Sequence, residues 1–384
     1  MKTEQVVIDL NLEELSQKGS TNYLTHNFHP YPAKFIPQIP KNTILNFTKE
    51  GDTVLDPFCG CGTTLVEAKL LNRNALGVDL NPIATLVSRA KITKINEEQL
   101  AQISRILLRM KKDITAYYSK TFEIERDEFP KFNNLEHWFQ YNVTAELSII
   151  RSYLRRIKDH TLRDYLYSAF SAIIVNVSNQ ESNTRFAAIN KNIKPFYTIN
   201  EFSKKIIDMN SRIIEFSTTA SDSEVDVYNA DSRELNFIQD NSIDHIVTSP
   251  PYANTYDYYL YHKFRIEWLG YDLKTLQDNE IGSRNRHSSK KEDISTFEDS
   301  LYPCIKEMSR VLKPGKTAVI VIGDSVIRGE LIRANTLIED IASENNFKLI
   351  KEMSYKLSTT SRMFNPKFTN KEKLEYIMFF KNSK

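Results

Sequence analysis

The feature that most constrains this chain is an alternation of short apolar runs and helical segments across residues 53–91. A first apolar run ends at Asp56, a glycine-rich turn follows, and residues 63–71 have helical spacing. A second run ends at Asp79, and Pro82 stands where a first-turn proline opens the next helix. Strand, turn and helix in repeated succession require crossover connections, so this segment predicts a parallel sheet.

Similar apolar runs return in the second half of the chain. They lie at residues 225–228, 246–248, 317–322 and 376–380. Each is short and bounded by polar or turn residues, and a Pro314-Gly315 turn introduces the third of them. Such runs suit strands that are buried on both faces. With the first two runs they supply enough strands for a doubly wound α/β sheet.

A segment with a different periodicity, residues 97–219, separates the two groups of strands. Apolar residues recur there at spacings of three and four, as at Leu147 and Ile150, which is typical of helices with one buried face. We therefore predict a helical insertion at 97–219 between a first part, 1–96, and a second part, 220–384, of one α/β domain. A length of 384 residues suits two or three structural units.

Composition narrows the classes of function. Hydrophobic residues make up 41% and charged residues 26%, which is ordinary for a globular protein. There is no apolar run of about 18 residues and no basic, apolar leader, so we expect neither a membrane span nor export. The net charge of +2 is too small to attract a polyanion by itself, so a nucleic-acid surface would have to be local.

The three cysteines, Cys59, Cys61 and Cys304, have no repeated spacing. An odd number without a pattern argues against a disulfide framework and favours a reducing compartment, so we expect a cytoplasmic protein. No second Cys or His pair at ligand spacing accompanies Cys59 and Cys61. We therefore expect these two cysteines to serve as small residues in a tight turn and not as metal ligands.

The turn at residues 56–64, Asp-Pro-Phe-Cys-Gly-Cys-Gly-Thr-Thr, lies where backbone can approach a ligand at a helix N-terminus. The dinucleotide fingerprint requires a third glycine where this chain has Leu65, which disfavours a pyrophosphate. Asp56 would suit an α-ammonium beside a sulfonium better than a phosphate. Asp79 can accept hydrogen bonds from ribose hydroxyls, and Asp231 from an adenine amino group. For each aspartate alone, a helix N-cap or turn role stays open.

A diproline ends one buried run, in Ser249-Pro250-Pro251-Tyr252. Prolines fix φ and donate no N–H, so this turn is rigid. If a flipped base sits there, Ser249 Oγ and the Pro250 carbonyl can accept both hydrogens of an exocyclic amine while Tyr252 stacks on the ring. Two such acceptors localise the lone pair of a poorly nucleophilic aromatic amine and aim it at a sulfonium methyl. A purely structural diproline turn is the alternative.

Pro303-Cys304 raises a rival chemistry, in which a cysteine attacks a pyrimidine ring. Residues 301–312 have helical spacing, however. We therefore expect Cys304 to be packed inside that helix.

The glycine turn and the S-P-P-Y tetrapeptide together resemble the bacterial DNA amino-methyltransferases of restriction-modification systems, particularly the N4-cytosine group. The resemblance implies a class I S-adenosylmethionine-dependent methyltransferase fold, a Rossmann-like sheet with an antiparallel last strand. It also implies S-adenosylmethionine as cofactor, double-stranded DNA with base flipping as substrate, and a cognate restriction endonuclease acting on the same site. Adenine-specific relatives more often begin the tetrapeptide with Asp or Asn, so N4 of cytosine is the expected target. N6 of adenine, an RNA guanine amino group and a non-catalytic nucleic-acid-binding relative stay as alternatives.

Residues 28–37 resemble the family segment that closes over the methionine end of the cofactor, and 311–316 and 374–380 resemble its later strands. The expected cofactor-binding residues are Tyr31, Lys34, Phe35, Asp56, Phe58, Gly60, Gly62, Thr63, Asp79 and Asp231. The expected catalytic residues are Ser249, Pro250, Pro251 and Tyr252.

The segment that reads the DNA sequence is less clearly marked. Family members usually carry their recognition region beside the tetrapeptide or near a terminus, whereas here the helical block lies between the second and third strands. We expect this block and residues 256–293 to share the work, because both are rich in basic side chains and the second also in tyrosine. The expected DNA contacts are Arg284, Arg286 and Lys290. The sequence sets neither the recognition site nor the oligomeric state.

Overall fold

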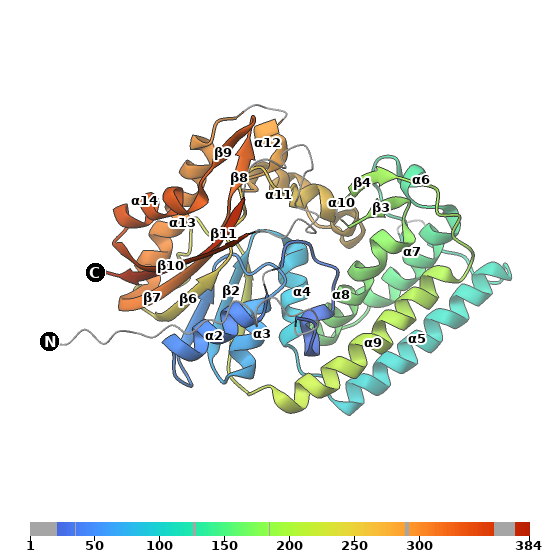
Figure 1. Cartoon of the computed structure of the whole chain (residues 1–384). Helices are drawn as coiled ribbons and strands as arrows, with labels where there is room; N and C mark the ends of the chain where they lie inside the picture. The colour runs from blue at the N-terminus through green and yellow to red at the C-terminus, as the bar shows by residue number, and fades with distance from the viewer. Residues whose placement is uncertain (1–20, 35, 126–127, 184, 289–291, 357–372) are drawn as a thin grey trace.

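The computed structural model describes residues 21–34, 36–125, 128–183, 185–288, 292–356 and 373–384. Its centre is a seven-stranded sheet with the order β10-β11-β7-β6-β1-β2-β5 (Figure 1). The strands are β1 Thr53–Asp56, β2 Asn74–Asp79, β5 Val225–Asn229, β6 Ile243–Thr248, β7 Leu312–Gly323, β10 Phe347–Lys356 and β11 Leu374–Asn382. The pairs among β5, β2, β1, β6 and β7 are parallel, and β11 runs antiparallel to both of its neighbours. This is the predicted class I methyltransferase sheet with its reversed last strand.

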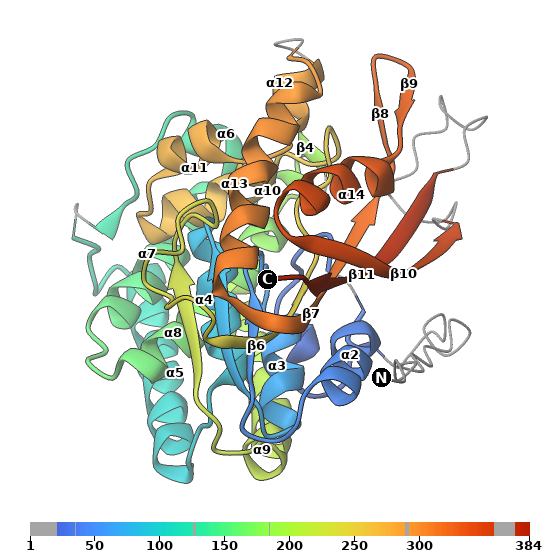
Figure 2. The ribbon, with the colours of Figure 1, turned by 90° about the vertical axis from the view of Figure 1, so that its left-hand side faces the viewer.

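Helices cover both faces of this sheet (Figures 1 and 2). The helices of the α/β part are α2 Gln38–Phe47, α3 Thr63–Leu70, α4 Pro82–Ile92, α10 Tyr258–Leu269, α11 Leu273–Asn279, α12 Arg284–Ser288, α13 Ser295–Val311 and α14 Ala334–Glu344, with a 3-10 turn, η1, at Leu24–Asn27. Successive strand residues point to opposite faces: Leu55 packs in the cluster that contains α13 and α14, whereas Val54 packs in the cluster that contains α2 and α3. Burial on both faces explains why the central strands are continuous apolar runs.

The helical segment contains α5 Glu97–Tyr118, α6 Leu135–Trp138, α7 Tyr141–Arg155, α8 His160–Val177 and α9 Tyr197–Thr219. Figure 1 shows these helices gathered beyond α4 on one side of the sheet. A capping box of Asn96 and Gln99 starts α5. The apolar faces of the block belong to one buried cluster with Val54 and Phe379 of the sheet, so the block shares the core of the α/β part.

Two features of the sheet differ from the sequence prediction. The Pro314-Gly315 turn does not precede a strand but lies inside β7, where the register passes from Ile243 opposite Leu312 to His245 opposite Thr317. Gly315, at φ +72°, forms an irregularity within the strand. Strand β10 was not predicted, because its side chains alternate between exposed and more buried positions and form no continuous apolar run.

Two small hairpins were also not predicted. They are β3 Gln180–Ser182 with β4 Arg185–Ala188, and β8 Ser325–Ile327 with β9 Glu330–Ile332. Their strands of three or four residues are too short to show a period in the sequence. Among the helices described here, none is long and apolar enough to cross a membrane.

Gly77 lets the first helix pack closely on the sheet. A Cβ on this glycine of β2 would lie 2.5 Å from Leu65 Cδ1 and 3.2 Å from Cys59 Sγ. Leu65 stands at the position where a dinucleotide fingerprint has its third glycine, whose role is close packing of helix on strand. In this chain the small residue is on the strand and the large one on the helix.

Candidate active site

The carboxyl ends of the parallel strands border a hollow that we call the first hollow. It encloses about 710 Å³ of space, including its open mouth. Its lining residues are Tyr31, Ala33, Phe58, Gly60, Asp79, Leu80, Asn81, Asp231, Ser232, Ser249, Pro251, Tyr258, Leu276, Asn279, Glu280 and Ile281. Open α/β sheets bind ligands at this edge, so the fold and the hollow agree on the position of a site.

The glycine turn between β1 and α3 forms one wall of the first hollow. Gly60 and Gly62 have φ of +50° and +77°, and Gly62 is the N-cap of α3. A Cβ on Gly62 would lie 2.8 Å from Ser88 Oγ, and the same hydroxyl donates to the Gly60 carbonyl at 2.9 Å. Both the left-handed backbone and the close approach of Ser88 therefore require glycine at position 62.

Asp79 projects from the end of β2 into the first hollow. Its two carboxylate oxygens each accept one backbone N–H, from Gly60 and from Asn81, both at 2.8 Å. Burial raises the pKa of Asp79 to about 6, and the two N–H donors oppose this rise. Each oxygen keeps a lone pair, so the carboxylate can accept further hydrogen bonds from a ligand's hydroxyls.

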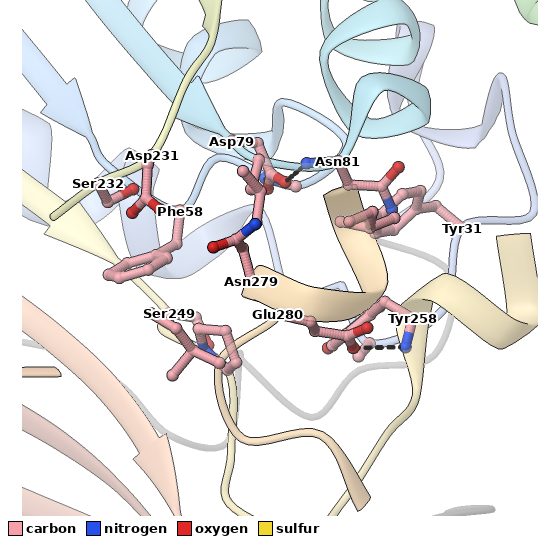
Figure 3. A pocket seen from close by; sticks show the side chains of 16 residues that line it. Tyr31, Phe58, Asp79, Asn81, Asp231, Ser232, Ser249, Tyr258, Asn279 and Glu280 are labelled. Atoms are coloured by element: carbon pink, nitrogen blue, oxygen red, sulfur yellow. Dashed lines mark hydrogen bonds between the residues drawn. The ribbon is translucent and has the colours of Figure 1, made fainter. Parts of the chain in front are cut away.

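Asp231, Ser232 and Phe58 form one end of the first hollow, and Tyr31 and Tyr258 lie toward the other (Figure 3). The Asp231 carboxylate also accepts from Arg233 Nε at 2.9 and 3.0 Å. A carboxylate held by a guanidinium still has acceptor capacity on its open side.

Asp56 does not line the hollow. It is fully buried and accepts from the hydroxyls of Thr64 and Thr248, each at 2.6 Å, and from the Phe58 N–H at 3.1 Å. Burial raises its pKa to about 6, against the effect of these donors. Asp56 therefore joins the glycine turn and α3 to the end of β6, and its oxygens are directed at its own chain rather than at an ammonium ligand.

A second hollow adjoins the first and encloses about 570 Å³ of space. Its lining residues are Ala33, Lys34, Ile36, Ser249, Pro250, Tyr252, Tyr256, Tyr258, Tyr355 and Glu375. Ala33, Ser249 and Tyr258 line both hollows. Ser249 thus stands at the boundary between a hollow lined by three carboxyl side chains, those of Asp79, Asp231 and Glu280, and a hollow lined largely by tyrosines.

The segment before α2 contributes to both hollows. Tyr31 lines the first and stacks on the ring of His262 with a centroid distance of 4.7 Å. Lys34 lines the second hollow and donates to the His26 carbonyl at 3.3 Å. Lys34 also borders a small third hollow together with Thr63, at the N-terminus of α3. Phe35 lies outside the described residues.

Glu280 and Asn279, from the end of α11, were not predicted. Glu280 accepts the N–H groups of Tyr258 at 2.6 Å and Tyr259 at 3.0 Å, so it caps α10 from about twenty residues away. Its burial raises its pKa to about 8. Figure 3 shows the Asn279 side chain pointing toward Asp79. No local sequence pattern predicts these two residues as part of the site. Only the tertiary fold brings the end of α11 to the carboxyl ends of the parallel strands.

Of the residues expected to contact DNA, Arg284 lies beside the second hollow. The N–H of Arg284 donates to the carbonyl of Tyr256, which lines this hollow, and the Arg284 side chain is exposed. Arg286 donates to the Asp278 carbonyl. Lys290 lies outside the described residues. Trp268 is fully buried in contact with Phe139 and Phe170 and belongs to the core.

The cysteines are packed inside the fold. Cys304 is fully buried in α13, donates to the Ser300 carbonyl, and burial raises the pKa of its thiol. Cys59 and Cys61 are also buried, and Lys91 Nζ donates to Cys61 Sγ at 3.2 Å. The part of the chain that the structure describes contains no group of three or more side chains arranged to hold a metal ion.

Comparison with known proteins identifies the family of this chain. A family of DNA methylases, of the N6 and N4 type, matches residues 10–87 and 243–384. Type II methyltransferase M.MjaII of Methanocaldococcus jannaschii is 25% identical over 446 residues, covering 93% of this chain and 81% of that protein. Type II methyltransferase M.MvaI of Kocuria varians is 24% identical over 424 residues, covering 94% and 92%. A SAM-dependent methyltransferase of Methanosarcina mazei is 12% identical and covers 89% of this chain and 97% of its own, with a TM-score of 0.35.

Because the family match spans more than half of the chain and includes both motifs, the protein belongs to the N6/N4 DNA methylases. It is an S-adenosylmethionine-dependent DNA amino-methyltransferase of the restriction-modification type, as the sequence motifs predicted.

Because Asp56 links the glycine turn to the strand before the diproline turn, removing one of its hydrogen bonds should lower the free energy of unfolding. Thr248→Val removes one hydroxyl donor to the buried carboxylate without changing side-chain shape, and a hydrogen bond to a charged group contributes about 1.5–3 kcal/mol. We expect urea denaturation to show a fall of that size in the free energy of unfolding. Thr43→Val, which removes a hydroxyl bonded to the neutral Pro40 carbonyl at 3.1 Å, should cost about 0.5–1.5 kcal/mol. Equal falls in the free energy of unfolding in the two variants would contradict a larger contribution from the hydrogen bond to Asp56.

Proposed function

We propose that this protein is a site-specific DNA methyltransferase that methylates the exocyclic amino group of a flipped base, with N4 of cytosine as the target. The observation that carries the proposal is the position of Ser249, which lines both hollows. A group at this boundary can touch a methyl donor in the first hollow and an acceptor base in the second. Transfer then needs only orientation of the two reactants, without a covalent enzyme intermediate.

The first hollow fits S-adenosylmethionine. Carboxylates beside the glycine turn would repel a pyrophosphate, whereas they suit hydroxyl, amino and cationic groups. We assign the ribose hydroxyls to Asp79 and the adenine to Asp231 and Phe58. Gly60 and Gly62 allow the backbone of the turn to approach the cofactor closely. Asp56 stabilises this turn by accepting hydrogen bonds from the Phe58 N–H and the Thr64 hydroxyl.

We assign the methionine end to the side of the site that Tyr31 and Lys34 border. Tyr31 lines the first hollow, and Lys34 and Thr63 meet at the third, where a cation and a helix N-terminus suit a carboxylate. Phe35 joins this assignment from the family resemblance. When bound, S-adenosylmethionine supplies an electrophilic methyl group on a sulfonium.

The second hollow supplies what a target amine requires. Ser249 Oγ and the Pro250 carbonyl accept its two hydrogens, Pro251 keeps the turn rigid, and Tyr252 stacks on the base. The acceptors draw the nitrogen toward tetrahedral geometry and free its lone pair for attack. A base inside a duplex cannot reach such a hollow, so the enzyme would have to flip it out. The serine that opens the tetrapeptide favours cytosine over adenine.

We assign DNA reading to the helical block, 97–219, and to residues 256–293. Arg284 is exposed next to the second hollow, and Arg286 lies two residues further. Lys290 completes the assignment from sequence alone. By analogy with Type II relatives, the enzyme would work in the cytoplasm and protect a site that a cognate restriction endonuclease cuts.

The direct test is methyl transfer from labelled S-adenosylmethionine by the purified protein, with unmodified duplex DNA and bulk transfer RNA as parallel substrates. We expect label in DNA only, and sequencing of the product should map it to N4 of cytosine at one recognition site. Label on adenine would correct the target base. Label in transfer RNA alone would replace the proposal with the RNA alternative.

Removing the acceptor should stop transfer but not cofactor binding. Ser249→Ala deletes one of two acceptors aimed at the amine, and removal of one such oriented group costs about 10²–10³ in kcat. Single-turnover methylation should show this fall, while titration calorimetry shows a Kd for S-adenosylmethionine within about threefold of wild type. Ser242→Ala, a change in an exposed turn, is the control. Full activity in Ser249→Ala would refute the acceptor role.

Cofactor affinity should depend on the ionisation of Asp79. Its pKa is raised to about 6, so the ionised acceptor is lost as pH falls from 7 to 5, and Kd should rise about tenfold in total over these two pH units. Asp79→Asn should bind about 10 to 100 times more weakly at pH 7. The pKa of Asp56 is also raised to about 6, so titration of Asp56 could change cofactor affinity over the same pH range. Asp79→Asn controls for this: if Asp79 is the group responsible, the Kd of the variant for S-adenosylmethionine should vary little between pH 7 and pH 5. An unchanged pH profile in that variant would transfer the effect to another group.

Reversing charge beside the second hollow should weaken DNA binding. Removing one cationic partner of a DNA phosphate lowers the slope of log K against log salt by about 0.9, so Arg284→Glu with Arg286→Glu should reduce the slope by about one to two units. Fluorescence anisotropy with duplex DNA at several salt concentrations measures this. Lys348→Glu, at an exposed lysine near the start of β10 and outside both assigned segments, is a matched surface control. Binding identical to wild type would remove residues 284–286 from the interface.

A further inference from the structure

Tyr252 is held by a row of residues across the sheet that belongs to neither motif. Gly323 of β7 lies opposite Glu375 of β11, and Glu375 lies opposite Tyr355 of β10. Three adjacent antiparallel strands therefore place these residues side by side in one line. Glu375 and Tyr355 also line the second hollow.

The first member of the row makes room for the Tyr252 ring. A Cβ on Gly323 would lie 2.6 Å from Tyr252 Cε2 and 3.0 Å from Tyr252 Cδ2. The ring therefore rests directly on the strand backbone, and any larger residue would displace it. Gly323 is needed for this close approach rather than for an unusual backbone conformation.

The second and third members fix the hydroxyl of Tyr252. Its O–H donates to Glu375 Oε1 at 2.6 Å, and the hydroxyl of Tyr355 donates to Glu375 Oε2. Both carboxylate oxygens are thus engaged by phenols, and the carboxylate cannot rotate without breaking one of these bonds. Hydrogen bonds of this charge-assisted kind are shorter and stronger than neutral ones.

The direction of these bonds determines what Tyr252 can offer to Ser249. A carboxylate only accepts, so the single proton of the Tyr252 hydroxyl is committed to Glu375. Ser249 and Tyr252 line the same hollow, and toward Ser249 the phenol oxygen can only accept. Tyr252 therefore does not use the lone pairs of Ser249, and these lone pairs are left for the hydrogens of an amino group.

From this arrangement we infer that Glu375 is a positioning residue: with Gly323 and Tyr355 it holds Tyr252 in place and keeps Ser249 as an acceptor for the target amine. The inference rests on the proposed function, because it assumes that the amine binds at Ser249. It adds three residues on β7, β10 and β11 to the machinery.

The test compares Glu375→Leu, Glu375→Gln and Tyr252→Phe in single-turnover and steady-state methylation of duplex DNA. Glu375→Leu removes the acceptor, and Tyr252→Phe removes the hydroxyl but keeps the stacking ring. Each should lower kcat about 10 to 100-fold, with KM for DNA and Kd for S-adenosylmethionine within about threefold of wild type. Glu375→Gln keeps one carbonyl acceptor for Tyr252 and should recover kcat to within about threefold. Glu352→Leu, at an exposed carboxylate of β10, is the matched control and should behave as wild type.

A double-mutant cycle separates this positioning role from a direct contact of Glu375 with the base. In the Tyr252→Phe background, Glu375→Leu should lower kcat by less than about twofold further, because the link is already broken. Losses that multiply would overturn the inference, as would full kcat in Tyr252→Phe or in Glu375→Leu. Tyr252→Phe is conservative, so it decides the question even if Glu375→Leu does not fold.

Failure of the proposed function looks different. If wild-type protein methylates no DNA amine, the function itself is wrong, whereas active wild type with unaffected variants refutes only the role of Glu375. The hydrogen bond is tested without methylation by the same cycle in urea unfolding. Coupling of less than about twofold in the unfolding equilibrium constant would also overturn the inference.

Discussion

The site depends on one buried carboxylate. Asp56 is fully buried at the end of β1 and accepts hydrogen bonds from the helix that follows it, through Thr64, and from the neighbouring strand, through Thr248. Burying a carboxylate costs free energy unless its oxygens accept hydrogen bonds. Moving Thr64 or Thr248 away would leave an oxygen of Asp56 without its donor, and this cost holds both threonines in position. Because Thr248 precedes Ser249, this link fixes the glycine turn and the diproline turn relative to each other.

The two hollows place different chemistry on either side of that link. Three carboxyl side chains, Gly60 and three aromatic rings border the first, which suits a ligand carrying hydroxyl, amino and cationic groups. Tyrosines, a lysine and a carboxylate border the second, which suits a planar base. The three shared residues make the wall between them thin. Residues at the carboxyl ends of the parallel strands border the first hollow, and the antiparallel strands β10 and β11 supply Tyr355 and Glu375 to the second.

Prediction from sequence was most successful where the signal is local. The strand ends at Asp56 and Asp79, the helix opening at Pro82 and the burial of Cys304 follow from short apolar runs, proline chemistry and helical spacing. It failed for β10, whose alternating residues form no apolar run, and for the Pro314-Gly315 segment, which lies within a strand. Glu280, Glu375 and Tyr355 carried no local signal at all, since their positions depend on pairings between distant segments.

The sequence by itself determined the alternation of strands and helices around the glycine turn, the turn itself and the S-P-P-Y tetrapeptide, because backbone sterics and apolar periodicity act over a few residues. The tertiary structure decided which side chains share a hollow, since that depends on strand register. Only pairing of β7, β11 and β10 aligns Gly323, Glu375 and Tyr355 beneath Tyr252. It also decided that Asp56, which the sequence places beside the ligand, is turned into the protein, because the donors that satisfy it come from two different elements.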